Sequence, residues 1–309
     1  MHSRSKIFQI RADTVQRVRE NVDLHRPGDI ENAVRILQDW IEKQSHFRRK
    51  DFPPEYLECT LVDCKGSVER TKAVLDRVAT VRSLMPDAFA PYSVREEFTT
   101  IRDHVHLLVL PQLTEEHERI GIVKVKKMKP KIMRTMYKFS FTLLDWGRLR
   151  GYWSSTVFVF DVSEGELGEL MASVNVLDLR NTYCVVIESF AIRIKRMHLV
   201  TSSRLVETFL TLVRSFMRKK IADKIVINRS IEELHHYYPK DILPKDYGGY
   251  DKSLDEIQED VLDELSSKEA VEFMEQMYER RTDEVLRPAG DFSEMYAGMA
   301  GTFRALSVD

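Results

Sequence analysis

The segment that decides the fold runs from Phe190 to Lys224 and reads FAIRIKRMHLVTSSRLVETFLTLVRSFMRKKIADK. Its first part alternates apolar and basic residues, which predicts a half-buried strand. The residues expected on the inner face of this strand are Phe190, Ile192 and Ile194, and those on the outer face are Arg193 and Lys195. The second part has apolar residues at intervals of three and four, which predicts an amphipathic helix. The apolar stripe of this helix consists of Leu205, Val206, Phe209, Leu210, Val213, Phe216, Met217 and Ile221.

Positive charge is concentrated in the same segment. Between Arg193 and Lys224, nine Lys or Arg residues stand against two acidic residues, a local charge of +7 within a chain of net charge −2. The stretch from Asp251 to Asp309 has six basic and sixteen acidic residues, a local charge of −10. We expect this acidic stretch to be either a solvated helical appendage or a cover folded back on the basic segment.

An apolar face with a cationic margin is typical of the wall and rim of a cavity that holds a hydrophobic molecule and releases it at an anionic membrane. The apolar stripe alone is also typical of a helix that simply packs on a sheet. The basic residues have three interpretations, which are a solvated face, a nucleic-acid patch and a membrane-contact patch. Aliphatic residues and Phe at buried spacing, rather than aromatic platforms, separate the basic residues, which favours lipid over nucleic acid.

Composition places the chain among ordinary globular proteins. Of its 309 residues, 43% are hydrophobic and 31% are charged, and no apolar run approaches the roughly 20 residues of a membrane-spanning helix. The first sixteen residues lack the apolar core of a secretory signal, so a cytosolic protein is expected. The three cysteines form no recognisable framework, and reduced, packed thiols are expected at Cys59, Cys64 and Cys184.

Two parts of the chain have different patterns. The first 90 residues or so are expected to be helical, with helix starts at Asp29, at Pro53-Pro54 and at Ser67. Short runs rich in Val, Ile and Phe then predict strands over 104–110, 121–125, 157–162, 184–187, 197–200 and 225–227. Helical patterns alternate with these strands, so an α/β fold with a mixed, largely parallel sheet is expected. Capping-box spacing at Ser230 with Glu233, and at Ser253 with Glu256, predicts two further helix starts.

Catalytic templates are absent from the sequence. It contains no GxGxxG, GxxxxGK[ST], GxSxG or HExxH motif. Asp161 ends a predicted strand, where α/β enzymes often place an acid, but a turn residue explains it as well. No Cys or carboxylate pattern completes a metal site with His104, His106 or His117. We therefore expect neither a metal, nor a cofactor, nor an enzyme.

Five segments, taken together and in order, resemble the CRAL-TRIO family. These are the intracellular lipid carriers related to cellular retinaldehyde-binding protein and α-tocopherol transfer protein, and the insect members are the most similar. The segments are DCKGSVERTK (63–72), VFD (159–161), FAIRIKRMHLV (190–200), FMRKKIADKI (216–225) and LPKDYGG (243–249), and the resemblance covers roughly residues 25–250.

The resemblance implies a fold and a set of functional residues. An N-terminal helical bundle (1–92) is expected to precede a lipid-binding α/β domain (93–250) with a pocket above its sheet and a mobile gate helix at about 202–217, followed by the acidic helical extension (251–309). The expected pocket residues are Phe190, Ile192, Ile194, Met197, Leu167, Leu170, Val174, Phe209, Leu210, Val213 and Phe216. A basic cleft that binds phosphoinositide head groups is expected at Arg193, Lys195, Lys220, Lys224 and Lys65.

One departure from the family concerns this cleft. The family carries arginines just before the position of Lys65, where this chain has Val62 and Asp63, and Gly66 replaces an aromatic residue. The resemblance predicts a non-enzymatic carrier of one tocopherol-, retinoid- or carotenoid-like molecule, in the cytoplasm and peripherally on membranes. Two alternatives stay open: a phosphoinositide-sensing scaffold without cargo, and a lipid enzyme that uses Asp161, His198 or Ser202.

Overall fold

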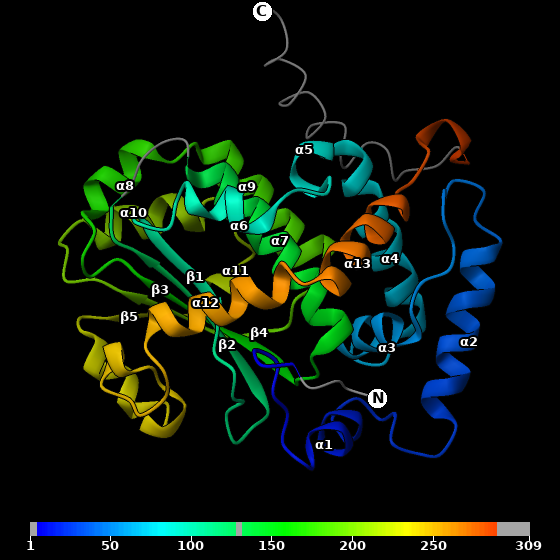
Figure 1. Ribbon diagram of the computed structural model, residues 1–309, viewed down its shortest axis with the longest axis horizontal. Helices are drawn as coiled ribbons and strands as arrows, with labels where there is room; N and C mark the ends of the chain where they lie inside the picture. Colours follow the sequence, from blue (N-terminus) through cyan, green and yellow to red (C-terminus); the bar gives the residue numbers. More distant parts are fainter. Residues whose placement is uncertain (1–4, 128–131, 289–309) are drawn as a thin grey trace, which may run out of the picture.

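The N-terminal part of the chain is helical, as its sequence predicts. The computed structural model describes residues 5–127 and 132–288 (Figure 1). The helices before the first strand are α1 (Thr14–Glu20), α2 (Asp29–Glu42), α3 (Pro54–Asp63), α4 (Val68–Leu84), α5 (Pro86–Phe89) and α6 (Val94–Thr99). The Ser67 side chain accepts a hydrogen bond from Arg70 N and caps α4, as predicted. Asp29 is instead the first residue of α2, because Gly28, at φ 88°, takes the cap position.

The sheet has five strands in the order β1-β2-β3-β4-β5. Their bounds are β1 (Val105–Val109), β2 (Glu118–Val125), β3 (Ser155–Asp161), β4 (Ile194–Val200) and β5 (Ile225–Asn228). β1 pairs antiparallel with β2, and the other pairs are parallel. The prediction of a mixed, largely parallel sheet is therefore confirmed.

The helices between the parallel strands lie on one face of the sheet. They are α7 (Ile132–Arg150), α8 (Leu167–Ser173), α9 (Val176–Cys184), the π-helix η1 (Val185–Ser189), α10 (Val206–Arg214) and α11 (Lys219–Ala222). Each crossover joins one parallel strand to the next strand along the sheet, always in the same direction. Because crossovers of this kind are right-handed, their helices all fall on the same side of the sheet. In Figure 1, α8, α9 and α10 lie above the strands accordingly.

Two predicted strands are wrong in whole or in part. The 184–187 run forms the end of α9 and the start of η1, because a short apolar run does not distinguish strand from buried helix. β4 begins only at Ile194, and Ala191, at φ 50°, has left-handed backbone before it. Phe190 and Ile192 are therefore not strand residues, although both are buried.

The predicted helix over 205–221 is divided. α10 ends at Arg214, and α11 begins at Lys219 after the extended backbone of Arg218. The expected gate helix at 202–217 thus corresponds to the shorter α10. The longest helix of the α/β part, α7, has no counterpart among the predicted elements.

The acidic C-terminal segment is part of the core. After the 3₁₀ turns η2 (Ile231–His236), η3 (Lys240–Ile242) and η4 (Lys245–Tyr247), it forms α12 (Leu254–Leu265) and α13 (Lys268–Glu279). Ser253 and Glu256 form the predicted capping box, whereas the Ser230 side chain makes no cap hydrogen bond. The apolar faces of the two helices are buried: Leu254, Ile257, Val261, Leu262, Leu265, Ala270, Phe273, Met274 and Met277.

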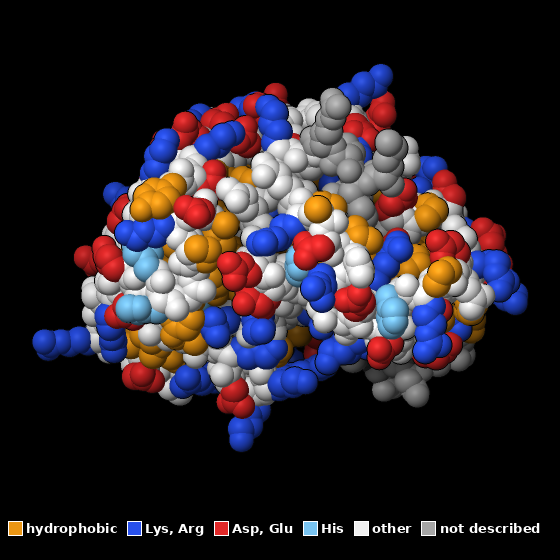
Figure 2. Space-filling model, turned by 90° about the horizontal axis from the view of Figure 1, so that it is seen from below, with side chains coloured by type: hydrophobic (Ala, Val, Ile, Leu, Met, Phe, Trp, Pro, Cys, Tyr) orange, Lys and Arg blue, Asp and Glu red, His pale blue; other side chains and the backbone are white. Residues whose placement is uncertain are grey.

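The acidic side chains of this segment pair with cations of the N-terminal half. Arg95 contacts both Glu259 and Asp263, and Arg150 contacts Glu269. The described part of the segment, residues 251–288, is therefore neither a solvated appendage nor a cover over the basic residues, so the interpretation from charge alone was wrong for this part. Residues 289–309 lie outside the described residues. Seen from below, the molecule has acidic and basic side chains interspersed over its surface (Figure 2).

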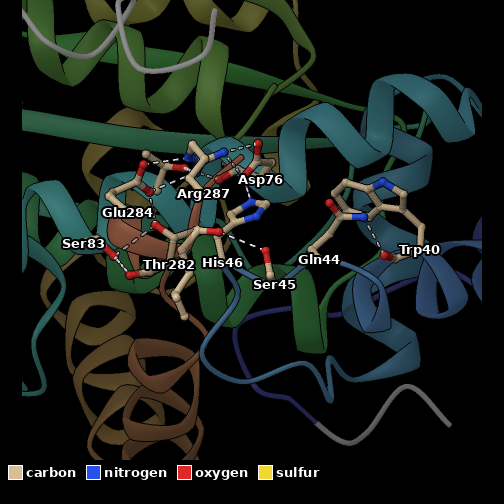
Figure 3. A network of polar contacts seen from close by, with 11 residues as sticks. Trp40, Gln44, Ser45, His46, Asp76, Ser83, Thr282, Glu284 and Arg287 are labelled. Carbon is tan, nitrogen blue, oxygen red and sulfur yellow. Dashed lines mark hydrogen bonds and ion pairs between the residues drawn. The ribbon is translucent and has the colours of Figure 1, made fainter. Parts of the chain in front are cut away.

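After α13, the chain runs back over the N-terminal helices as a strap, which we define as residues 280–287. Phe47 and Thr282 form an antiparallel bridge, and Ser83 Oγ donates to Thr282 O at 2.6 Å. Figure 3 shows Arg287 between Glu284 and Asp76. Arg287 Nη1 donates to Asp76 Oδ2 at 2.9 Å, and His46 Nε2 lies 2.9 Å from Asp76 Oδ1. The strap therefore ends in a charged, largely buried network on α4.

Arg287→Ala will loosen the strap. Hydrogen bonds to charged groups contribute about 1.5–3 kcal/mol, so hydrogen exchange at the amides of Thr282 and Leu286 should become faster. Burial raises the pKa of Asp76, but hydrogen bonds from His46 and Arg287 outweigh it and hold the pKa below its usual value. The contribution of Asp76 to the stability of the fold is thus present at pH above about 4 and is lost as the pH falls further.

Arg48→Ala, which removes an exposed 3.5 Å contact with Asp283, is the control. Equal exchange in both variants would contradict the prediction.

Candidate functional site

The two faces of the sheet differ in how completely they are buried. The register pairs Val123 with Phe160, Phe158 with Met197, and Met197 with Ile225, so these side chains share one face. Apolar side chains on this face that are only partly buried are Val109, Val123, Phe158, Phe160, Met197, Ile225 and Ile227. On the other face, the side chains of Leu108, Ile120, Ile122, Val157, Val159, His198, Val200 and Asn228 are buried.

This difference is unexpected for the central strand. β3 lies in the middle of the sheet with helices on one side and the C-terminal segment on the other, and such a strand is normally buried on both faces. The rings of Phe158 and Phe160 nevertheless stay partly accessible, with their centroids 5.9 Å apart. α12 packs closely on β1, whereas α8, α9 and α10 make few close backbone contacts with any strand. The helix-covered face is thus less tightly packed than its opposite.

The predicted pocket residues divide into two groups. Phe190, Ile192 and Ile194 are buried in one hydrophobic cluster with Phe141 of α7, and Met197 packs against it. The other cluster contains Leu167, Leu170 and Leu210, with Val174 and Phe209 partly buried against it. Val213 and Phe216 are also partly buried, and Phe216 makes an edge contact with the Tyr183 ring. Phe158 packs against the first cluster and Phe160 against the second, so this ring pair connects them.

The predicted cationic residues do come together. Burial lowers the pKa of Lys224, and the charges of four neighbours, Lys220, Lys65, Lys195 and Arg193, lower it further. Lys224 Nζ also donates to Ile194 O. We call these five residues the basic cleft, after the family feature to which the resemblance assigns them. Lys65 reaches it from the turn after α3, where left-handed backbone at φ 57° redirects the chain.

The basic cleft borders the first hydrophobic cluster. Arg193 and Lys195 flank the buried Ile194, and Lys220 precedes Ile221, which packs against that cluster. Lys195 is half exposed and lies 3.3 Å from the buried carboxylate of Glu118. The arrangement can therefore hold phosphate oxygens beside an apolar surface.

The comparison with protein-family models matches residues 103–249 to the CRAL/TRIO domain. The chain carries a CRAL/TRIO domain. The predicted resemblance to the CRAL-TRIO family is thereby confirmed for this part of the chain. The match contains all five strands, α7 to α11 and both groups of predicted pocket residues, and of the basic cleft only Lys65 lies outside it.

Curated relatives match a shorter stretch than the CRAL/TRIO domain. Proteins named alpha-tocopherol transfer protein-like from Mus musculus, Pongo abelii and Homo sapiens are each 36% identical over 69 residues, which is 22% of this chain. The matched stretch spans 20% of the length of each relative. Among solved structures, the crystal structure of Sfh5 aligns with a TM-score of 0.45 and 10% identity over 80% of this chain and 92% of that one.

The residues considered for catalysis do not form a site in the CRAL/TRIO domain. Asp161 is fully buried and accepts hydrogen bonds from Tyr247 Oη at 2.8 Å and Ser163 Oγ at 2.6 Å. His198 is also buried, with Nδ1 2.7 Å from Asn228 Oδ1. Both lie on the face of the sheet opposite Phe158 and Phe160, while Ser202 is exposed. Asp161 and His198 thus hold the C-terminal turns and β5 in place.

The histidines considered for metal binding have other partners. His106 Nε2 lies 2.7 Å from Asp255 Oδ1, and His117 Nδ1 lies 3.1 Å from Thr14 Oγ1. Within residues 5–127 and 132–288, no group of three His, Cys, Asp or Glu side chains is placed to hold a metal ion. No helix in the same ranges is long and apolar enough to cross a bilayer.

Sequence reasoning missed the residues at the centre of the accessible face. Phe158 and Phe160 belong to a strand that was predicted correctly, and their alternation with Val157 and Val159 makes both faces of that strand apolar. The two large aromatic side chains on a single face were the available signal. Val123, Ile225 and Ile227 gave no comparable signal, because β-branched residues also lie on the opposite face of their strands, at Ile122 and Val226.

Proposed function

We propose that the protein is a non-enzymatic carrier that binds one hydrophobic small molecule over the accessible face of the sheet, beneath α8 and α10. The observation that carries the proposal is the partial burial of Phe158 and Phe160 on the central strand of a covered sheet. The CRAL/TRIO domain and the name of the curated relatives support a lipid as the guest. The proposed class is a tocopherol-, retinoid- or carotenoid-like molecule, carried in the cytoplasm.

The expected binding energy requires a means of release. A guest that loses about 500 Å² of apolar surface gains on the order of 12 kcal/mol before ordering costs. α10 is suited to opening, because only Val206 and Leu210 are buried in it. Leu205, just before it, is 46% exposed, which leaves an apolar side chain free to enter a bilayer. We assign the gate to α10.

The basic cleft is proposed to bring the gate to an anionic membrane through phosphoinositide head groups. Its five cations border the cluster that contains Ile194, so phosphates bound there would lie beside the apolar site. Each cation near an anionic leaflet contributes about 1 kcal/mol, which suits reversible, peripheral contact. A phosphoinositide-sensing scaffold would use the same cleft but would leave the sheet face without a guest.

Native mass spectrometry of freshly purified protein distinguishes the carrier from the scaffold. We expect about one lipophilic molecule per chain, identified by extraction with organic solvent. Protein that neither retains nor accepts such a molecule would overturn the carrier proposal.

Phe160→Trp will lower the retained guest several-fold, because the larger ring occupies space over the sheet. Val285→Trp is the control, since Val285 is 91% exposed on the strap and its replacement leaves the sheet face unchanged. The measurement is the ratio of loaded to empty protein in native spectra. Equal loading of the two variants would place the guest elsewhere.

A further inference from the structure

A buried carboxylate lies next to the basic cleft. Asp63 is the last residue of α3, and its side chain is only 12% exposed. Its Oδ2 lies 3.4 Å from Arg148 Nη2 of α7. Arg148 Nη2 also donates to Phe190 O, and its Nη1 lies 3.4 Å from Tyr56 Oη. The guanidinium of Arg148 is thus shared among several acceptors and does not serve Asp63 alone.

Asp63 also acts on Arg193, a member of the basic cleft. The charge of Arg193 lowers the pKa of Asp63, and the charge of Asp63 in turn raises the pKa of Arg193. Arg193 Nη1 is buried without a hydrogen-bond partner among the described residues. A buried donor without a partner is unfavourable, so this guanidinium gains from any acceptor that the Arg193 side chain can turn to, including a phosphate at the cleft. Asp63 and a bound phosphate would therefore compete for the charge of Arg193.

We propose that Asp63 sets the affinity of the basic cleft for polyphosphorylated head groups, because its carboxylate offsets the charge that Arg193 would otherwise offer to a phosphate. This inference rests on the proposed function of the cleft and adds the residue that tunes it. The cleft then holds a head group more weakly than its five cations alone would, and it strengthens when Asp63 is neutral.

The charge of Asp63 responds to mild acid. Burial raises its pKa to about 6, even though Arg148, Arg193 and Arg70 all lower it. The charged and titratable groups that face it are Arg148 of α7, Arg70 of α4, Arg193 before β4, Cys59 of α3 and Cys64 after it. Burial raises the pKa of both thiols, that of Cys64 to about 11, so neither titrates near neutral pH. As the pH falls through about 6, Asp63 loses its charge and the cleft gains one net positive charge.

The test measures binding of the full chain to phosphatidylcholine vesicles with a few per cent phosphatidylinositol bisphosphate. At about pH 7.5, where Asp63 is ionised, Asp63→Asn should bind about fivefold more tightly than the native chain, the equivalent of one additional cation near the surface. At about pH 5 the two proteins should bind alike, because both then carry a neutral group at this position. The readout is the ratio of the two dissociation constants at each pH. Phosphomonoesters of the head group also titrate near pH 6, and their titration affects both proteins alike.

Two controls separate charge from position. Asp39→Asn makes the same change in net charge on α2, at an exposed residue paired with Arg35, and should leave binding unchanged. Arg193→Gln keeps Asp63 but removes the cation on which it acts. Lowering the pH from about 7.5 to about 5 should then strengthen the binding of Arg193→Gln no more than it strengthens the binding of Asp63→Asn. Arg193→Gln serves as the second variant if Asp63→Asn fails to fold. Soluble inositol trisphosphate should show the same ratios, and an effect confined to vesicles would overturn the role of the cleft.

The outcomes are distinguishable. Native and Asp63→Asn chains that bind equally at both pH values would overturn the role of Asp63 and leave the proposed carrier intact. If the native chain binds bisphosphate vesicles no more tightly than plain phosphatidylcholine vesicles at either pH, the proposed membrane contact itself is overturned.

Discussion

Asp145→Ala will lower the free energy of unfolding by about 3–5 kcal/mol, because it leaves a buried guanidinium without its counter-ion. Both carboxylate oxygens of Asp145 accept from Arg82 Nη2, at 2.6 and 2.7 Å. Tyr56 Oη donates to the same carboxylate at 2.9 Å. The side chains of Arg82 and Asp145 are 1% and 8% exposed, so water cannot replace the lost partner. Chemical denaturation monitored by far-UV circular dichroism measures the change.

The matched control is Asp87→Ala. Asp87 pairs with Arg134 at 2.9 Å, with side chains 72% and 71% exposed. Exposed pairs of this kind contribute about 0–1 kcal/mol. Replacing Arg82 and Asp145 together by Met and Leu should restore much of the stability, because neither charge of the pair is then left buried without its partner. Equal losses in Asp145→Ala and Asp87→Ala would mean that the buried pair does not hold α4 to α7.

Replacing both Lys220 and Lys224 by Ala will slow transfer of the guest to anionic vesicles by about 30-fold, since each cation contributes about 1 kcal/mol of attraction. Both belong to the basic cleft, and Lys224 Nζ donates to the backbone oxygen of Ile194 and not to an apolar side chain of the sheet. The affinity for the guest in solution should therefore stay nearly unchanged. A fluorescent lipid analogue, passed from the protein to vesicles that contain a quencher, gives the rate.

The control for this prediction removes two cations elsewhere. Lys268→Ala with Arg35→Ala leaves the cleft intact, because these side chains are 90% and 66% exposed on α13 and α2. Transfer should then proceed at the native rate, and raising the salt concentration should slow the native chain toward the double variant. A native rate in the Lys220 and Lys224 double variant would rule out the basic cleft as the membrane contact.

The sequence predicted the five strands of the sheet, together with a false strand at 184–187, and it predicted the five cations of the basic cleft, for different reasons. Strands such as β3 are short apolar runs bounded by turns, and this local pattern survives in the folded chain. The five cations could be predicted as a group because the resemblance placed Lys65 beside Arg193, Lys195, Lys220 and Lys224, which are distant in the sequence. A local pattern cannot relate residues that are so far apart. Phe190 and Ile192 show the limit of periodicity, since their alternation is that of a strand although left-handed backbone at Ala191 separates them.

Packing between distant segments was beyond prediction. The charge of the C-terminal segment did not predict that Phe273 and Met277 are buried. Their burial depends on surfaces supplied by α3 and α7. The proposed competition between Asp63 and a phosphate for Arg193 was equally hidden. The sequence shows an acid where the family has arginines, but only the folded chain shows that this acid is buried and that Arg193 acts on it.

The strap and α12 bear on how this protein is made. Ser5 Oγ donates to Glu264, and Phe47 pairs with Thr282, so the first helices find their final partners more than 200 residues later. During synthesis, α1 to α4 leave the ribosome long before α12 and α13 are translated, so the surfaces that Glu264, Phe273 and Thr282 cover in the folded chain stay open meanwhile. Nascent chains that stall before Leu254 should therefore be substrates for chaperones.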